Sequence, residues 1–329
     1  MVRDRRHSGY SSHIRQVKTV WRIGIVLALF VLAGLVLPFA LNLKNKGPNI
    51  QKDLLRLWEE GSYKNAFDLS KAELDRRPLD YFLLTVHGFS AYQIGVSQIN
   101  NSDTMAYIDQ CIWSLRKALL AKNDGNNGRV YYVLGKAYYY KGAFFADLAV
   151  KFLEQARAFS YAARDIPEYL GLAYAALQDY RSSVAAFTLA LEPSPAGESA
   201  LAGEEEFDEG EKGPSDLLLL SIARSYIALG EPLAAKAYLI RCIESSRDSW
   251  SVVAARLLFG GVLAGEGAGE EAEAQYMLIL EENGENAEAH YQLGELYAAR
   301  GDTTRARAEW RRAVRIDPAH RQARLRLNI

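Results

Sequence analysis

The stretch AEAHYQLGELYAARGDTTRARAEWRRAVRIDP, residues 287–318, decides the fold class. Its small and large apolar residues recur at positions that let two helices approach closely and fill the space between them. The small ones are Gly294, Ala306 and Ala313, and the large ones are Leu293, Tyr297 and Trp310. Gly301 and its polar neighbours indicate a turn, and Pro318 ends the second helix. The stretch therefore indicates a helix, a turn and a second helix.

The same spacing of small and large apolar residues, called the register below, recurs earlier in the chain. One unit begins at Val253, with Gly260 and Tyr276 at positions that match Gly294 and Trp310. The unit before it begins at Asp216, with Ala223 and Leu239 at the same two positions. The pattern resembles the tetratricopeptide repeat (TPR), a helix-turn-helix unit of 34 residues. The resemblance implies an all-α fold, a right-handed α-solenoid of six or seven repeats over residues 47–318. Units are expected to start near residues 47, 81, 128, 164, 216, 253 and 287.

Three segments depart from the regular pattern. In the unit from Tyr81, an insertion around residues 96–104 is expected to precede the second helix. Residues 196–215 hold seven acidic side chains and one lysine, which indicates a solvated acidic loop between repeats; a docking peptide around Phe207 for a basic partner is the alternative. Residues 319–329 are expected to form a helix that caps the last repeat, although their Leu-Arg-Leu pattern could also be extended.

The N-terminal segment indicates membrane attachment. Residues 23–41, IGIVLALFVLAGLVLPFAL, carry no charge and would form a helix about 28 Å long, enough to cross a hydrocarbon core. Residues 1–22 hold six basic side chains and one acidic one. The positive-inside rule therefore predicts a basic cytoplasmic tail over 1–22, a transmembrane signal anchor over 23–41, a linker over 42–46 and an extracytoplasmic repeat domain. The expected location is the cytoplasmic (inner) membrane, with the repeats in the periplasm.

A cleaved signal peptide would share the basic and apolar regions. The apolar stretch is longer than the usual signal-peptide core, and Pro38-Phe39-Ala40 is a poor cleavage site, so retention as an anchor is favoured. Gly24 and Ala28 form a small-xxx-small pair that could bring two such helices together, so a homo-oligomer is possible.

Composition excludes several classes of function. The 329 residues are 49% hydrophobic and 24% charged, with a net charge of -1, so neither general disorder nor nucleic-acid binding is indicated. The two cysteines, Cys111 and Cys242, and the five histidines do not stand at metal-ligand spacing, and no catalytic or nucleotide-binding motif occurs. His87 and His290 are expected to pack in the repeat core. We expect no enzyme activity, no cofactor and no metal.

The resemblance also implies a binding face, since TPR first helices line a concave groove. In the unit from Tyr81 and the unit from Gly128, the positions that would point into it carry mainly aromatic residues, although several could instead contact neighbouring helices. The candidate groove residues are Phe82, Phe89, Tyr92, Arg129, Tyr132, Lys136, Tyr139 and Tyr140. Tyrosine suits binding because it offers a large area and a polar tip at little cost in side-chain entropy.

These features predict a membrane-anchored scaffold for protein-protein interactions. Its groove would hold peptide segments or helices of other envelope proteins, and the anchor would raise their effective concentration. The alternative is a periplasmic chaperone or adaptor that holds unfolded clients in the same groove.

Overall fold

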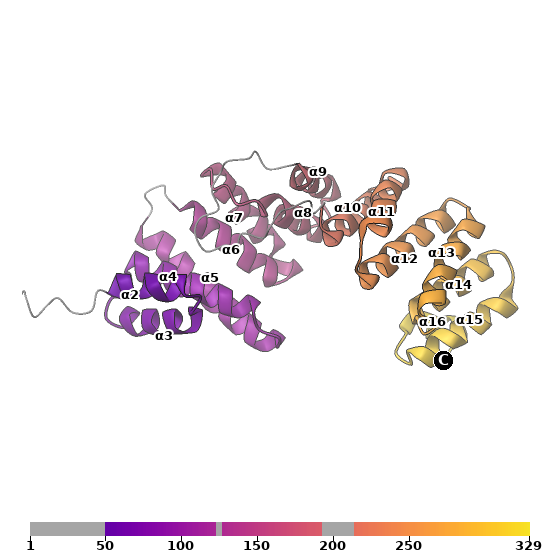
Figure 1. Ribbon diagram of the computed structural model, residues 1–329, viewed down its shortest axis with the longest axis horizontal. Helices are drawn as coiled ribbons and strands as arrows, with labels where there is room; N and C mark the ends of the chain where they lie inside the picture. The colour runs from indigo at the N-terminus through magenta and orange to yellow at the C-terminus, as the bar shows by residue number, and fades with distance from the viewer. Residues whose placement is uncertain (1–49, 123–126, 193–213) are drawn as a thin grey trace, which may run out of the picture. The chain divides into compact units, whose positions relative to one another are not determined.

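The computed structural model describes residues 50–122, 127–192 and 214–329 (Figure 1). These residues form fifteen α-helices and one short 3-10 helix, with no strand among them, as an all-α repeat fold requires. The predicted tail, anchor and linker, and almost all of the acidic segment 196–215, lie outside the described residues. No described helix is long and apolar enough to span a bilayer.

The chain divides into two compact units, Met1–Ser62 and Tyr63–Ile329. In the first, the structure describes α2 (Ile50–Glu59) and the turn that follows it. The second begins with α3 (Tyr63–Leu74) and continues as six helix pairs and a terminal helix. The pairs are α4 (Tyr81–Val96) with α5 (Asn101–Ala121), α6 (Gly128–Tyr140) with α7 (Ala146–Ala158), α8 (Ile166–Ala176) with α9 (Tyr180–Leu191), α10 (Asp216–Leu229) with α11 (Pro232–Ser245), α12 (Ser249–Gly265) with α13 (Gly269–Glu282), and α14 (Ala287–Ala299) with α15 (Thr303–Ile316); η1 (Ala143–Phe145) precedes α7, and α16 (Arg321–Leu327) ends the chain.

Each helix of the second unit packs on the next one along the chain. In addition, the first helices of successive pairs contact one another, from α4 through α6, α8, α10 and α12 to α14. The first helices therefore share one continuous face, which is the face on which the resemblance places the groove.

Glycines inside the first helices explain how closely the two helices of a pair approach. A Cβ built on Gly260 would lie 2.5 Å from the ring of Tyr276, and a Cβ on Gly294 or Gly171 would collide with Trp310 or Phe187 in the same way. The large side chain of the second helix therefore occupies the space that a glycine of the first helix leaves empty. This confirms the packing reason inferred from the register of the last repeat.

Turns and caps define the ends of the helices. Gly267 and Gly301 have φ values of +83° and +82°, which glycine adopts without strain, and each lies between the two helices of a pair. Asp80, Asp248 and Asn286 each accept a hydrogen bond from a backbone N–H in the first turn of the helix that follows.

The structure differs from the expected boundaries at three helices. The second helix after Tyr81 begins at Asn101, so residues 101–104 of the expected insertion are helical and make α5 longer than its counterparts. Asn100 provides the N-cap that starts it there. Helix α8 begins at Ile166 after Asp165, and α12 begins at Ser249, four residues before the expected start, because Asp248 caps it. Residues 321–327 form α16, within the segment expected to hold a terminal helix.

Candidate functional site

Aromatic rings from three first helices meet around the amino group of Lys136 on α6. Its Nζ lies 4.6 Å from the ring centroid of Tyr169 on α8, 4.9 Å from that of Tyr132 and 5.8 Å from that of Tyr92 on α4. A cation at these distances is attracted by the ring electrons. We use the name tyrosine cluster for Tyr92, Tyr132, Lys136, Tyr139, Tyr140, Asp165, Glu168 and Tyr169.

A polar network forms the base of the tyrosine cluster. Nζ of Lys136 donates to Oδ2 of Asp165 at 2.6 Å and to Oη of Tyr132 at 2.8 Å, and Oη of Tyr132 donates to Oδ1 of Asp165 at 2.7 Å. The Lys136 side chain is only 13% exposed. Because these buried polar groups satisfy one another, the base of the cluster is held in a single arrangement.

Three tyrosines form the accessible layer above this base. The ring of Tyr139 stands edge-on to that of Tyr169 with centroids 5.3 Å apart, and Oη of Tyr140 lies 3.5 Å from Oη of Tyr169. Tyr140 is 36% exposed. Burial raises the pKa of both Tyr139 and Tyr169, so their phenols are neutral at pH 7 and offer O–H groups and ring faces.

Glu168, on the first turn of α8, adds a carboxylate to this layer. Burial, and next the negative charge of Asp165, raise the pKa of Glu168 above its usual value. Within the described part of the chain, no hydrogen bond or ion pair neutralises this carboxylate. The cluster therefore combines aromatic ring faces with a partly desolvated negative charge, an arrangement that suits a cation.

The structure brings some of the predicted groove residues together and separates others. Tyr92 and Tyr132, expected to point into an open groove, are 8% and 5% exposed. They are buried because the next first helix packs over them, and for Tyr132 because it bonds to Asp165. Lys136 lies between them, and Tyr139 is partly exposed. The prediction that Tyr92 and Tyr132 offer open binding surface is wrong, and they support the cluster from below.

The remaining predicted residues lie beside the cluster. The guanidinium of Arg129 lies 5.0 Å from the ring centroid of Phe89, so these two side chains form a cation–π pair between α4 and α6. Phe82 is half-buried in the first turn of α4 and is not part of the tyrosine cluster.

Sequence reasoning did not select Asp165, Glu168 or Tyr169. A signal for the two acidic residues was present, since they occupy the same positions in the unit from Arg164 as Arg129 and Tyr132 occupy in the unit from Gly128. Applying the register to this third unit would have found them.

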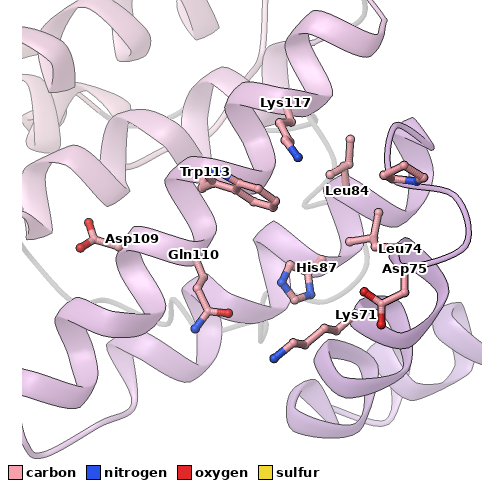
Figure 2. Close-up of a pocket in the computed structure, with 10 residues that line it drawn as sticks. Lys71, Leu74, Asp75, Leu84, His87, Asp109, Gln110, Trp113 and Lys117 are labelled. Carbon is pink, nitrogen blue, oxygen red and sulfur yellow. The ribbon is translucent and has the colours of Figure 1, made fainter.

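A second feature, which the sequence did not indicate, is a cleft of about 560 Å³ between α3 and α5. Figure 2 shows Trp113 of α5 and Leu84 of α4 on opposite sides of it, with His87 between them. Trp113 is 57% exposed in mid-helix, and Nζ of Lys117 lies 3.7 Å from its ring centroid. The cleft is lined by Lys71, Leu74, Asp75, Pro78, Leu84, His87, Asp109, Gln110, Trp113 and Lys117. His87 stacks on Phe67 with centroids 4.2 Å apart, which confirms its predicted packing role.

The described residues contain no group of three or more His, Cys, Asp or Glu side chains placed to hold a metal ion. Cys111 and Cys242 are buried and free, and burial raises the pKa of the Cys242 thiol to about 11. At neutral pH this thiol is protonated, and the thiolate is the reactive form.

Comparison with protein families finds two matches, both to models of the tetratricopeptide repeat. One covers residues 218–249, which span α10 and α11, and the other covers residues 287–320, which span α14 and α15. Both segments therefore match the tetratricopeptide repeat in sequence. The described helix pairs between and before them follow the same helix-turn-helix order. Neither matching model names a catalytic activity.

Among the similar solved structures, the first one below has a TM-score above 0.5 and supports the same fold. The C-terminal part of a TPR repeat-containing protein from Cytophaga hutchinsonii is 13% identical, with a TM-score of 0.57, and the match covers 85% of this chain and 100% of that one. A TPR protein from Parabacteroides merdae is 17% identical, with a TM-score of 0.48 and coverage of 85% and 96%. YrrB, described as a TPR protein with an unusual peptide-binding site, is 22% identical, with a TM-score of 0.45 and coverage of 65% and 98%. No curated protein matches the chain.

Proposed function

We propose that this protein is a scaffold for protein-protein interactions, and that the tyrosine cluster receives a segment of its partner. The observation that carries the proposal is the layer formed by Tyr139, Tyr140 and Tyr169, because partly exposed tyrosines held on a rigid base are typical of binding hot spots. The ring faces and the carboxylate of Glu168 favour a segment that carries a lysine or arginine.

We further propose that the scaffold is anchored in the cytoplasmic membrane by residues 23–41, with its repeats on the extracytoplasmic side and other envelope proteins as partners. The apolar segment and the basic residues before it support this proposal. Anchoring would confine the tyrosine cluster to a thin layer beside the membrane, so that modest affinities suffice for assembly. Paired anchors, through Gly24 and Ala28, would make the scaffold a homo-oligomer.

Photo-crosslinking in cells tests the binding face. A photoreactive amino acid is placed at Tyr140 or at Phe89, and at Leu233 of α11 as a matched control, since Leu233 is 77% exposed and far along the chain. We expect the first two positions to capture the same one or two proteins and Leu233 not to capture them. Capture of many unrelated unfolded chains would favour a chaperone instead, and identical capture at all three positions would contradict the proposed face.

Membrane anchoring needs a separate measurement. The full-length chain should sediment with membranes and resist extraction by high salt, whereas a variant without residues 1–46 should be released. A C-terminal reporter that is active only outside the cytoplasm should be active on the full-length chain. An active cytoplasmic reporter would contradict the orientation without bearing on the tyrosine cluster.

A further inference from the structure

The cleft between α3 and α5 has a buried histidine at its floor. His87 is only 5% exposed, and its Nδ1 lies 3.3 Å from the carbonyl oxygen of Phe67 and 3.2 Å from Oγ of Ser70. Oγ of Ser70 donates its own hydrogen to the Phe67 carbonyl at 2.9 Å, so it can only accept from the histidine. Nδ1 therefore carries the ring proton, and Nε2 presents a lone pair.

No partner satisfies this lone pair within the described part of the chain. Nδ1 makes all of the hydrogen bonds that the structure assigns to the ring, and His87 lines the cleft. His87 lines the cleft, so Nε2 is available to accept a hydrogen bond from a donor on a group that enters it.

The surroundings keep the ring neutral. Burial is the largest influence and lowers the pKa of His87; the hydrogen bond to the Phe67 carbonyl opposes it, the charge of Lys71 adds to it, and the charge of Asp68 opposes it. The other charged groups around the cleft are Asp75, directly after α3, and Asp109 and Lys117 on α5. At pH 7 the floor of the cleft is thus a hydrogen-bond acceptor and not a cation.

The residues that line the walls of the cleft indicate which other chemical groups the ligand carries. Leu74, Pro78 and Trp113 supply apolar surface, with the buried side chain of Leu84 behind them, and the volume lies within the range of small-ligand sites. Lys71 and Lys117 lie at two ends of the cleft in Figure 2, and neither has a carboxylate partner among the described residues. Asp109, by contrast, is paired with Lys141.

We propose that this cleft recognises an aromatic side chain that carries a hydrogen-bond donor, tyrosine or tryptophan, within an acidic segment of a partner protein. The ring packs against Trp113 and Leu74, its O–H or N–H donates to Nε2 of His87, and neighbouring carboxylates contact Lys71 and Lys117. A tyrosine or tryptophan side chain is flat and apolar with one polar group at its edge, so it is complementary to this lining. The site is separate from the tyrosine cluster and does not depend on it.

Matched tripeptides test the proposal on the full-length chain in lipid nanodiscs with ¹⁵N-labelled histidine. Acetyl-Glu-Tyr-Glu-amide should bind at least about fivefold more tightly than acetyl-Glu-Phe-Glu-amide, since they differ only in the hydroxyl that donates to His87. Acetyl-Lys-Tyr-Lys-amide should bind more weakly than either. The Nε2 resonance of His87 should move on addition of the Glu-Tyr-Glu peptide and hardly at all with the Phe peptide.

Two variants complete the test. His87→Asn keeps a donor near the position of Nδ1 and removes Nε2, so it should abolish the preference for tyrosine over phenylalanine. Trp113→Ala changes an exposed side chain and leaves the fold intact; it should weaken both Glu peptides, whereas Trp250→Ala, at a site 64% exposed on α12, should weaken neither. Equal binding of the Tyr and Phe peptides, or an Nε2 resonance that does not move, would overturn the proposal.

Discussion

At the scale of single residues, Lys136 is the charged side chain of the tyrosine cluster whose amino group is most enclosed by other residues. Enclosing its ammonium costs desolvation free energy, which the bond to Asp165, the bond to Tyr132 and the surrounding rings offset. The positive charge of Lys136 and the negative charge of Asp165 neutralise one another, so removal of either side chain leaves the other charge partly buried without its partner.

A double-mutant cycle measures this dependence. Lys136→Met and Asp165→Asn should each lower the free energy of unfolding by about 1–2 kcal/mol, less than for a fully buried pair because Asp165 is 33% exposed. The double variant should lose clearly less than the sum of the two, by about 1 kcal/mol. Urea titration followed by circular dichroism gives all four values, and strict additivity would mean that the pair is uncoupled.

Two adjacent glycines on α12 provide a sharper test of packing. A Cβ at Gly260 would lie 2.5 Å from the ring of Tyr276, whereas a Cβ at Gly261 meets nothing within 4 Å. Gly260→Ala should therefore destabilise the protein by about 1–3 kcal/mol. Gly261→Ala should stabilise it by about 0.5–1 kcal/mol, because alanine is the better helix former. Denaturant titration of both variants checks the opposite signs.

The candidate site was predictable at this scale only in part. The repeat register correctly placed Tyr132, Lys136 and Tyr139 on a first helix and Tyr92 on the one before it. It could not show that Tyr132 is buried, since that depends on a contact with Asp165, which lies 33 residues beyond Tyr132 and reaches it only through the fold. Nor could it show that Tyr92 is buried, since that depends on how the next first helix packs. Trp113 gave no signal either, because an exposed and a buried tryptophan look the same in sequence.

At the scale of helices, local signals set most boundaries. Helices α4, α10 and α14 begin at the residues where the register starts a unit, because a capping side chain precedes each of them. Helix α6 also begins at such a residue, Gly128. Helix α5 departs from this, since residues 101–104 are polar and suggest a loop, yet they form the first turn of the helix after the cap at Asn100. Repeat families tolerate such extensions, and composition alone does not distinguish a polar helical turn from a loop.

Capping aspartates predict how stability depends on pH. Hydrogen bonds from Ser182 and Ser251 lower the pKa of Asp179 and Asp248, and the backbone N–H of Arg305 lowers the pKa of Asp302, all from a usual value of 3.8. An acid with a lowered pKa in the folded state stabilises above its unfolded pKa and loses this contribution as the pH falls through the folded value. The free energy of unfolding should therefore drop between about pH 5 and about pH 3.

The matched control replaces all three aspartates with asparagine. Asparagine caps a helix about as well but does not titrate in this range, so the stability of the triple variant should depend less steeply on pH. Guanidinium titrations of both proteins across this range provide the comparison. Parallel pH profiles would show that other carboxylates dominate the acid response.

At the scale of the whole molecule, the described repeats form a chain of neighbour-to-neighbour contacts. Core residues near the C-terminus, such as Leu293, Trp310 and Leu327, form one cluster, and residues from α4 to α9 form another. In such an array, stability is close to a sum over repeats and their interfaces, and terminal elements protect the last interface from water.

The terminal helix α16 should therefore matter locally. Leu327 is 8% exposed and Leu325 is 66% exposed on the same helix. Leu327→Ala should destabilise the last repeat by about 2 kcal/mol or more, and Leu325→Ala should have little effect. Hydrogen exchange should become faster in α14 and α15 of the Leu327 variant and stay unchanged from α4 to α8. Faster exchange throughout would show that the array unfolds as a single cooperative body.

Neighbour-only contacts also determine how the protein responds to load. If such an array is held at one end and pulled through a bound partner at the other, the main contacts among the described helices join neighbours in the array. Helix pairs would then separate one after another, each releasing a short length of chain while the rest stay folded. The array would extend in small reversible steps, as a spring does, and would keep its partner attached under strain that would detach a single rigid domain.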